Sequence, residues 1–319
     1  MSSVTNLENM FDLSKYNFSW DHDLIIIAGA TAVGKSNIAV QLANEIKGVI
    51  INADSVQVYK DLNVLSARPN SKNMDCVPHY LYGYVNSSNT FSVSNWLFDL
   101  KEKLVEIKKN KKVPILVGGS GLYINAAING LVPIPAISEN IKQESLSKLG
   151  RIGLDKFREM LFDIDPVFLQ KNNDKHRLLR AHSVYLQTSK PLSFWHDQPR
   201  EGKVSKQIYS FLISSERKVL YKNCDIRFNQ MLSAGGLQEV IKLHNKNIDR
   251  SLPIMKSLGV KWLLNYLDSQ ISFDEAIRLS MRDTRHYVKR QLTWFRHNYI
   301  PNKINSIESN FKELLIDFI

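Results

Sequence analysis

The stretch that decides the fold is LIIIAGATAVGKSNIAVQLANEI, from Leu24 to Ile46. A short apolar run typical of a buried strand meets a glycine-bounded loop, and an amphipathic helical segment begins at Lys35 and Ser36. The loop matches GxxxxGK[ST] in the strand–loop–helix context that this phosphate-binding motif requires. Backbone amides in the loop and the N-terminus of the helix favour an anion. The stretch therefore predicts a bound phosphate group.

Each residue of this loop is a candidate ligand. Lys35 supplies a compact positive charge, and the Ser36 hydroxyl is a candidate ligand for Mg²⁺. The predicted cradle consists of Gly29, Ala30, Thr31, Ala32, Val33, Gly34, Lys35 and Ser36. The motif predicts phosphate binding but not ATP hydrolysis, because the later stretch PILVGGSG has glycines and a serine where a hydrolase often has a second carboxylate.

The order of elements predicts an α/β fold. Apolar runs typical of strands occur at Leu24–Ile27, Val49–Ile51 and Val113–Val117, each followed by turn residues and a helical pattern. Strands that alternate with helices favour a parallel sheet, so we expect a P-loop NTPase-like sheet flanked by helices. Ligands of such sheets bind at the carboxyl ends of the strands, where the candidate loops of this sequence lie.

The pattern changes between residues 131 and 199. LVPIPAIS leads into a charged stretch with helical spacing of its apolar residues, so we expect an all-helical insertion domain. QIYSFLIS, at Gln207–Ser214, predicts a return to the sheet, and the pattern from there to the C-terminus is helical. The predicted core therefore comprises residues 23–130 and 200–319, and the polar residues 1–22 form an N-terminal extension.

Charge, cysteine and histidine spacing and the length of apolar runs exclude several classes of protein. A net charge of +11 and a pI of about 9.4 fit either a polyanionic partner such as nucleic acid or a lysine-rich background. The two cysteines form no CxxC and the eight histidines no HxH or HExxH, so neither a disulfide framework nor a His-bound metal is expected. The chain has no membrane-length apolar run and no secretion signal, so we expect a cytoplasmic protein without membrane contact.

A second candidate loop lies in GVIINADSVQVYKDLNVLSARPN, from Gly48 to Asn70. The preceding strand brings Asp54 to the carboxyl edge of the sheet, followed by Ser55 and Gln57. A glutamine can pair with an adenine edge, and a carboxylate can take a proton from an amine. An Asp-Ser turn that caps a helix explains the same residues, so on their own they leave both interpretations open.

Seven motifs in order carry a resemblance to a known family: GATAVGKS, INADSVQVYKDLNV, VPHYL, VGGSGLY, HRLLRAHSVYLQTSKPLS, PIMKSLGV and TRHYVKRQLTWFRHN. Together they resemble the tRNA dimethylallyltransferases, or isopentenyl tRNA transferases, over nearly all of residues 24–298. The resemblance implies transfer of a dimethylallyl group from its diphosphate to the exocyclic amine of adenosine 37 in tRNA. The phosphate loop would then hold the diphosphate of dimethylallyl diphosphate, with Mg²⁺, rather than ATP.

The resemblance also implies roles for individual residues. Asp54 would bind the adenine amine and act as general base, and Arg217 would be a catalytic ligand of the leaving group, with Arg227 as a further diphosphate ligand. The residues implied to fix the extruded adenosine are Ser55, Val56, Gln57 and Ser120, the last replacing a more common threonine. Two departures from the family stand at Asn223, where an arginine is usual, and at Val260, where a tyrosine is usual.

A basic stripe on a predicted helix is a candidate surface for tRNA. At 100° per residue its members fall within about 60° of each other, opposite Tyr287 and Trp294, which we expect in the core. The stripe consists of Arg278, Arg282, Arg285, Lys289 and Arg296. A solvated helix face gives the same pattern, but the family resemblance favours tRNA phosphate contacts. The family segment HRLLR adds His176, Arg177 and Arg180, and we expect the insertion to clamp the anticodon stem-loop.

Two other functions remain as alternatives. One is a P-loop kinase or NTPase that acts on a small metabolite or nucleotide, and it would turn over without tRNA. The other is a non-catalytic RNA-binding module, but an intact phosphate loop together with Asp54 argues against a dead site. We expect the enzyme to be a monomer.

Overall fold

The structure, a computed structural model, describes residues 23–69, 76–205, 207–301 and the backbone of 303–306. The chain divides into two compact units, one of residues 129–203 and the other of the residues on either side. The predicted N-terminal extension, residues 1–22, lies outside the described residues.

A parallel sheet forms the centre of the larger unit, as predicted. Its strands in the described residues are β1 (Asp23–Gly29), β2 (Gly48–Asn52), β3 (His79–Tyr80), β4 (Val113–Gly118), β5 (Gln207–Ser214) and β6 (Lys303–Ser306). Their spatial order is β3-β2-β4-β1-β5-β6, with Ile25 of β1 opposite Ile115 of β4 and Tyr209 of β5. Two of these strands were not predicted. The two residues of β3 are too few to show a period, and β6 contradicts the all-helical C-terminal pattern that we expected.

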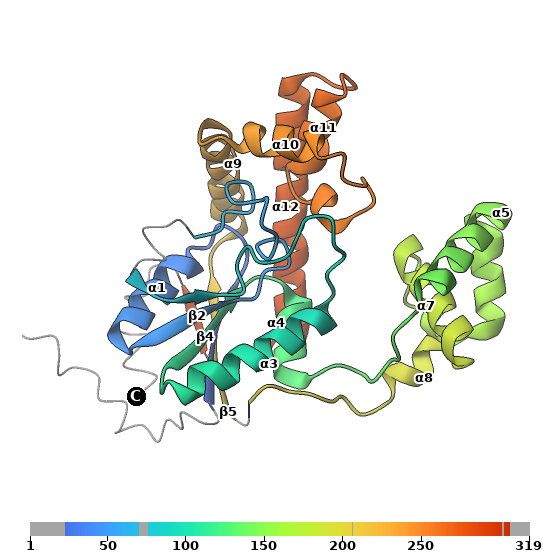
Figure 1. Cartoon of the computed structure of the whole chain (residues 1–319), viewed down its shortest axis with the longest axis horizontal. Coiled ribbons are helices and arrows are strands. Elements are labelled where there is room, and N and C mark those ends of the chain that lie inside the picture. Colours follow the sequence, from blue (N-terminus) through green and yellow to red (C-terminus); the bar gives the residue numbers. More distant parts are fainter. Residues whose placement is uncertain (1–22, 70–75, 206, 302, 307–319) are drawn as a thin grey trace, which may run out of the picture. The chain divides into compact units, whose positions relative to one another are not determined.

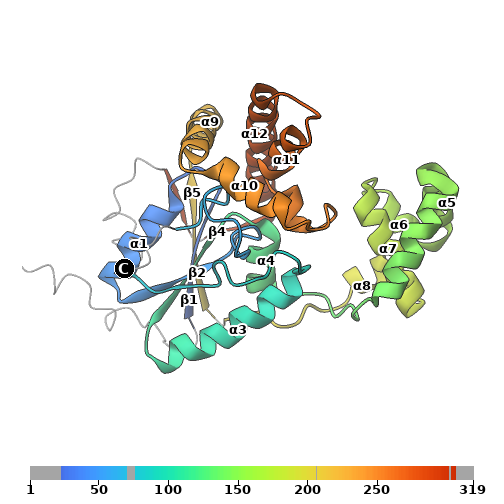
Figure 2. The same ribbon diagram turned by 45° about the horizontal axis from the view of Figure 1, so that its top comes forward.

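Helices cover the sheet and extend beyond one end of it. They are α1 (Lys35–Glu45), α3 (Val93–Lys109), α4 (Gly121–Asn129), α9 (Arg217–Ser233), α10 (Gly236–Asn245), η3 (Pro253–Lys256), α11 (Val260–Leu267) and α12 (Phe273–Asn298). Figures 1 and 2 show α1 on one side of the sheet and α3 and α4 on the other, while α9 to α12 gather together. This arrangement is the predicted α/β, P-loop NTPase-like fold.

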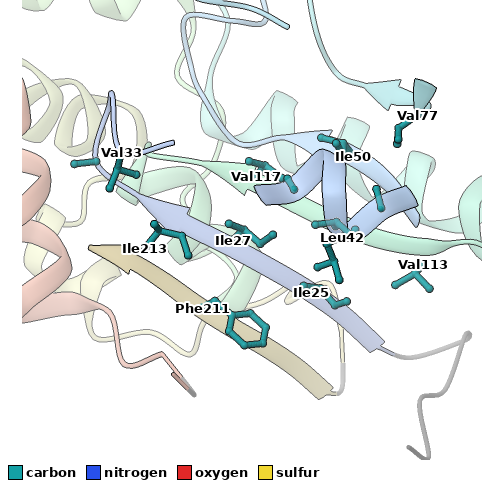
Figure 3. Packing of buried hydrophobic residues seen from close by; sticks show 14 of the residues in the cluster. Ile25, Ile27, Val33, Leu42, Ile50, Val77, Val113, Val117, Phe211 and Ile213 are labelled. Atoms are coloured by element: carbon teal, nitrogen blue, oxygen red, sulfur yellow. The ribbon is translucent and has the colours of Figure 1, made fainter. Parts of the chain in front are cut away.

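Buried apolar residues explain why the strands form this sheet. Every residue of β1, β2 and β4 is buried, which is typical of parallel strands covered on both faces. Figure 3 shows the cluster between the sheet and α1, where Ile25 and Ile27 of β1 lie with Phe211 of β5 and Leu42 of α1. Burying each such side chain stabilises the fold by roughly 1.5–3 kcal/mol. The sheet is therefore a rigid base for the loops at its carboxyl edge.

The second unit consists of helices and has a core of its own. Its helices are α5 (Glu139–Ile164), α6 (Pro166–Leu169), α7 (Lys175–Thr188) and α8 (Leu192–His196). Phe157, Leu161, Leu178 and Val184 form the centre of its apolar cluster. The unit is a few residues wider at each end than the predicted insertion, 131–199. None of the helices in the described parts of either unit is long and apolar enough to cross a membrane.

Candidate active site

The phosphate loop, Gly29–Ser36, joins β1 to α1 and has the geometry of an anion cradle. Two residues have a left-handed backbone, Ala32 with φ 62° and Gly34 with φ 85°, and α1 begins directly after Gly34. A side chain at Gly29 would lie 2.8 Å from the Ile213 carbonyl oxygen, so the loop passes too close to β5 for any residue but glycine. A loop of this shape at the N-terminus of a helix favours a bound anion.

Lys35 is a partly buried cation in this loop. Its Nζ donates to the Ala30 carbonyl at 3.2 Å. Burial lowers the pKa of Lys35 to about 8, Asp54 opposes the decrease, and Arg227 adds to it. The ammonium is thus poorly solvated and lies near another cation, so an anion bound here would be strongly attracted.

The Asp54 carboxylate is held by its own loop. The Asp54 amide donates to Asn52 Oδ1 at 2.8 Å, and Asn52 Nδ2 donates to the carbonyls of Asp54 and Leu81 at 2.9 and 3.0 Å. The Val56 amide donates to Asp54 Oδ1 at 2.9 Å. Among the residues that the structure describes, Oδ2 has no partner, so one carboxylate oxygen is left to accept a proton.

Two side chains tie the loops at the carboxyl edge of the sheet to each other. Ser120, which follows β4, accepts at 3.0 Å from the Ser55 amide through its Oγ. Gln291 of α12 accepts from the Thr31 amide at 2.9 Å through Oε1 and donates from Nε2 to the Gly119 carbonyl at 2.9 Å. Sequence reasoning missed Gln291. The sequence did contain a signal for it, because Gln291 lies on the same face of the predicted helix as Tyr287. An amide side chain buried on that face must find hydrogen-bond partners.

A cavity of about 340 Å³ opens beside Asp54, and we call it the Asp54 cavity. Its polar lining includes Thr31, Asp54, Ser55, Arg227, Tyr287 and Arg290. Its apolar lining includes Val56, Tyr59, Leu65, Phe91, Phe228, Met231 and Leu258. A carboxylate among apolar and aromatic groups suits a flat polar ring together with a small hydrocarbon group.

A second hollow of about 720 Å³ lies in front of the phosphate loop, and we call it the phosphate-loop hollow. Its lining includes Gly34, Lys35, Ser36, Arg68, Asn223 and Arg227. Ala32, Arg227 and Met231 line both spaces, so the two adjoin. Arg227 stands between them, and burial lowers the pKa of Arg227 while Asp54 and Cys224 oppose the decrease.

The two predicted arginines of α9 lie in different places. Arg227 joins Lys35 and Asp54 at the boundary between the two spaces, as the diphosphate role requires. Arg217, predicted as catalytic, lines neither of them. It borders a third hollow together with Ala30 of the phosphate loop, Lys289 and Arg296. Arg227 therefore lies at the two spaces and Arg217 does not, and the roles of both arginines stay predictions.

Gln57 and Tyr287 also differ from expectation. Gln57 donates from Nε2 to the carbonyls of Ser66 and Ala67 at 2.9 and 3.1 Å, so donation by this amide to an adenine edge would require these bonds to break. The expectation that Tyr287 is a core residue is wrong, because its side chain is partly buried and lines the Asp54 cavity. Burial and the Asp54 carboxylate raise the pKa of Tyr287, so its hydroxyl stays a hydrogen-bond donor. Trp294 is likewise only partly buried.

The basic stripe lies along α12 but is partly neutralised. Its ion pairs are Arg278–Glu275 at 2.6 Å, Arg282–Asp283 at 2.9 Å and Arg285–Asp225 at 2.8 Å. Lys289 and Arg296 are exposed, and neither has an ion-pair partner among the described residues. In the helical unit, His176, Arg177 and Arg180 are exposed on α7. Their roles in tRNA binding stay predictions.

Comparisons with known proteins give the family. The model of the IPP transferase family matches residues 57–298. The tRNA dimethylallyltransferase of Ehrlichia chaffeensis is 37% identical over 280 residues, which cover 87% of this chain and 92% of that protein. The crystal structure of the tRNA isopentenylpyrophosphate transferase from Bacillus halodurans has 30% identity and a TM-score of 0.66, over 93% of this chain and 94% of the other. A eukaryotic dimethylallyltransferase, solved acting on tRNA, has 25% identity and a TM-score of 0.78, over 92% and 78%. These matches confirm the resemblance carried by the motifs, and the chain belongs to the IPP transferase family.

Proposed function

We propose that this enzyme transfers a dimethylallyl group from dimethylallyl diphosphate to the exocyclic amine of adenosine 37 in tRNA and releases diphosphate. The observation that carries the proposal is the junction of two spaces at Arg227. On one side, Lys35 and Ser36 line the phosphate-loop hollow. On the other, Asp54 lies in a cavity that polar and apolar side chains line together. A donor whose diphosphate and hydrocarbon group occupy different spaces fits this junction.

The phosphate-loop hollow would bind the leaving group. Lys35 and Arg227 would stabilise the charge that gathers on the diphosphate as the bond between the allylic carbon and its oxygen breaks. Ser36 is exposed in the hollow and would hold Mg²⁺. No group of three or more His, Cys, Asp or Glu side chains in the described residues could hold a metal, so the remaining ligands would be phosphate oxygens and water. Mg²⁺ there would neutralise charge on the leaving diphosphate.

The Asp54 cavity would bind the acceptor. The amine nitrogen forms a bond to the allylic carbon, and Asp54 Oδ2 takes the proton that the nitrogen loses. The base must leave the anticodon stack to reach this enclosed carboxylate. Ser55 and Val56, beside Asp54, and Tyr287 across the cavity would hold the extruded ring. The apolar residues of the lining would hold the dimethylallyl group and exclude water.

The rest of the tRNA would contact basic side chains. Lys256 and Arg290 lie at the Asp54 cavity, and Lys289 and Arg296 are exposed on α12. Contacts of these residues with phosphates would fix the position of the anticodon stem-loop. A cytoplasmic location and a monomeric state also belong to this proposal. The named relatives favour the transferase over the kinase alternative.

The experiment is transfer of radiolabelled dimethylallyl diphosphate to unmodified tRNA with Mg²⁺ and without ATP. Wild-type protein should label the tRNA, and Asp54→Asn should reduce the rate by at least about a hundredfold, because the amide keeps the shape but cannot take a proton. Ser88→Ala, at an exposed serine that lines neither space, is the matched control and should leave the rate unchanged. An absence of label with wild type across a full tRNA pool would refute the proposed function. A fully active Asp54→Asn would refute the role of Asp54 alone.

A further inference from the structure

Arg68 is a partly buried arginine that the mechanism above does not use. It lines the phosphate-loop hollow together with Lys35 and Ser36. Its Nε donates to Asn63 Oδ1 at 3.1 Å, and its Nη1 donates to the Tyr59 carbonyl at 3.3 Å. Both partners are neutral. In the described part of the chain no carboxylate pairs with this guanidinium, and Nη2 makes no hydrogen bond.

The loop that carries Arg68 is held from one side by Glu239 of α10. The Glu239 carboxylate accepts from three successive backbone amides, those of Asn63 and Val64 at 2.8 and 2.7 Å through Oε1 and that of Leu65 at 3.0 Å through Oε2. Hydrogen bonds to a charged acceptor are about twice as strong as neutral ones. Glu239 therefore fixes the first half of the loop to the helices at the end of the sheet.

Other hydrogen bonds hold the second half of the loop that carries Arg68. Gln57 donates to the carbonyls of Ser66 and Ala67, as described above. The Arg68 amide donates to the Asn63 carbonyl at 3.1 Å, which closes the loop on itself. The backbone of Arg68 is thus fixed before any ligand binds, and little entropy would be lost when its side chain binds one.

Gly83 has no side chain, and the guanidinium of Arg68 occupies the space where one would lie. It has a left-handed φ of +57°, and a side chain there would begin 1.7 Å from Arg68 Nη1. The left-handed backbone favours glycine at this position, and the missing side chain leaves room for the guanidinium in its present place.

We propose that Arg68 binds phosphate oxygens of the donor diphosphate in the phosphate-loop hollow. The inference rests on the proposed function. An arginine with neutral partners, held in place beside an anion cradle, has free N–H groups in the planar arrangement that suits two oxygens of one phosphate. Burial lowers the pKa of Arg68, and the nearby Glu239 carboxylate opposes part of the decrease, so a bound anion would add to a charge that is poorly solvated. A phosphate of tRNA has the same chemistry, and the experiment separates the two sources.

The test measures diphosphate and tRNA affinity separately. Calorimetric titration with dimethylallyl diphosphate and Mg²⁺, without tRNA, should show about tenfold weaker binding for Arg68→Gln, the loss expected for a charge-assisted hydrogen bond. Unmodified tRNA, measured by filter binding without the donor, should bind within about twofold of wild type. Lys101→Gln removes one charge from an exposed position on α3 that lines neither space, and it should leave both affinities unchanged.

A second variant moves the charge within the hollow. Asn223 is neutral and lines the same space. The double variant Arg68→Gln/Asn223→Arg should therefore recover most of the lost donor affinity, which a structural defect in the loop would not allow. If Arg68→Gln lowers tRNA affinity but not donor affinity, Arg68 binds a tRNA phosphate and the inference is overturned. If Lys35→Ala abolishes donor binding while Arg68→Gln leaves it unchanged, only the inference fails. If Lys35→Ala has no effect either, the proposed function fails.

Discussion

Lys35 should make donor binding depend on pH near neutrality. Burial lowers the pKa of Lys35 to about 8 in the free protein. At pH 7 about nine-tenths of the molecules carry the ammonium, and at pH 9 about one-tenth do. A bound diphosphate favours the charged form and raises the pKa of Lys35. The affinity therefore falls as pH rises above the pKa of the free protein, by about tenfold between pH 7 and pH 9.

The assay is calorimetric titration with dimethylallyl diphosphate at constant ionic strength and Mg²⁺ concentration, from pH 6.5 to pH 9. This donor is preferred to inorganic diphosphate, whose own ionisation continues in that range. Lys35→Arg is the matched control, because a guanidinium stays charged throughout and its affinity profile should be flat. A flat profile for wild type would refute the reasoning. So would an equal fall in Lys35→Arg, which would assign the titration to another group.

Three further predictions concern stability and the bonds between loops. The folded pKa of Lys35 lies below the unfolded value of 10.5, so the ammonium destabilises the ligand-free fold below pH 8 and this cost disappears as pH rises to about 10.5. Lys35→Met should accordingly raise the free energy of unfolding at pH 7, by at most about 3 kcal/mol, in urea titrations; an unchanged midpoint would contradict this. Gln291→Ala leaves the Thr31 amide without its partner, so it should lower the free energy of unfolding by about 1–3 kcal/mol in the same titrations and weaken donor binding. A variant as stable as wild type would show that this hydrogen bond does not stabilise the loop. Ser120→Ala removes the acceptor of the Ser55 amide and should slow transfer to tRNA several-fold, whereas Ser120→Thr should keep it; equal rates for both would exclude a role for the hydroxyl.

The sequence predicted those parts of the site that depend on local patterns. Glycines, a lysine and a serine between an apolar run and a helix identify the phosphate loop without any tertiary contact. The buried strands β1, β2 and β4 and the partly buried strand β5 are visible as apolar runs for the same reason. The two-residue strand β3 exists only because β2 provides its partners, and no pattern of two residues could predict it.

Residues that reach the site from distant elements could not be predicted in this way. Gln291 and Tyr287 contact the loops from α12, and Arg68 acts through a loop fixed by Glu239. The separation of the two predicted arginines follows from the helix alone. Arg217 lies ten residues before Arg227 on α9, and a rise of about 1.5 Å per residue places their backbones roughly 15 Å apart.

The lining of the two spaces explains why a phosphate loop would support transfer rather than hydrolysis. Among the described residues that line them, Asp54 is the only acid. One of its oxygens already accepts from the Val56 amide, and the residue lines a cavity with both polar and apolar groups. The described lining therefore has no second carboxylate to hold a metal ion and position a water molecule for attack. An aromatic amine of the right shape would displace water and bring its own proton to Asp54 Oδ2. The cations of the phosphate-loop hollow would then stabilise the leaving diphosphate while the amine in the adjoining cavity takes the dimethylallyl group.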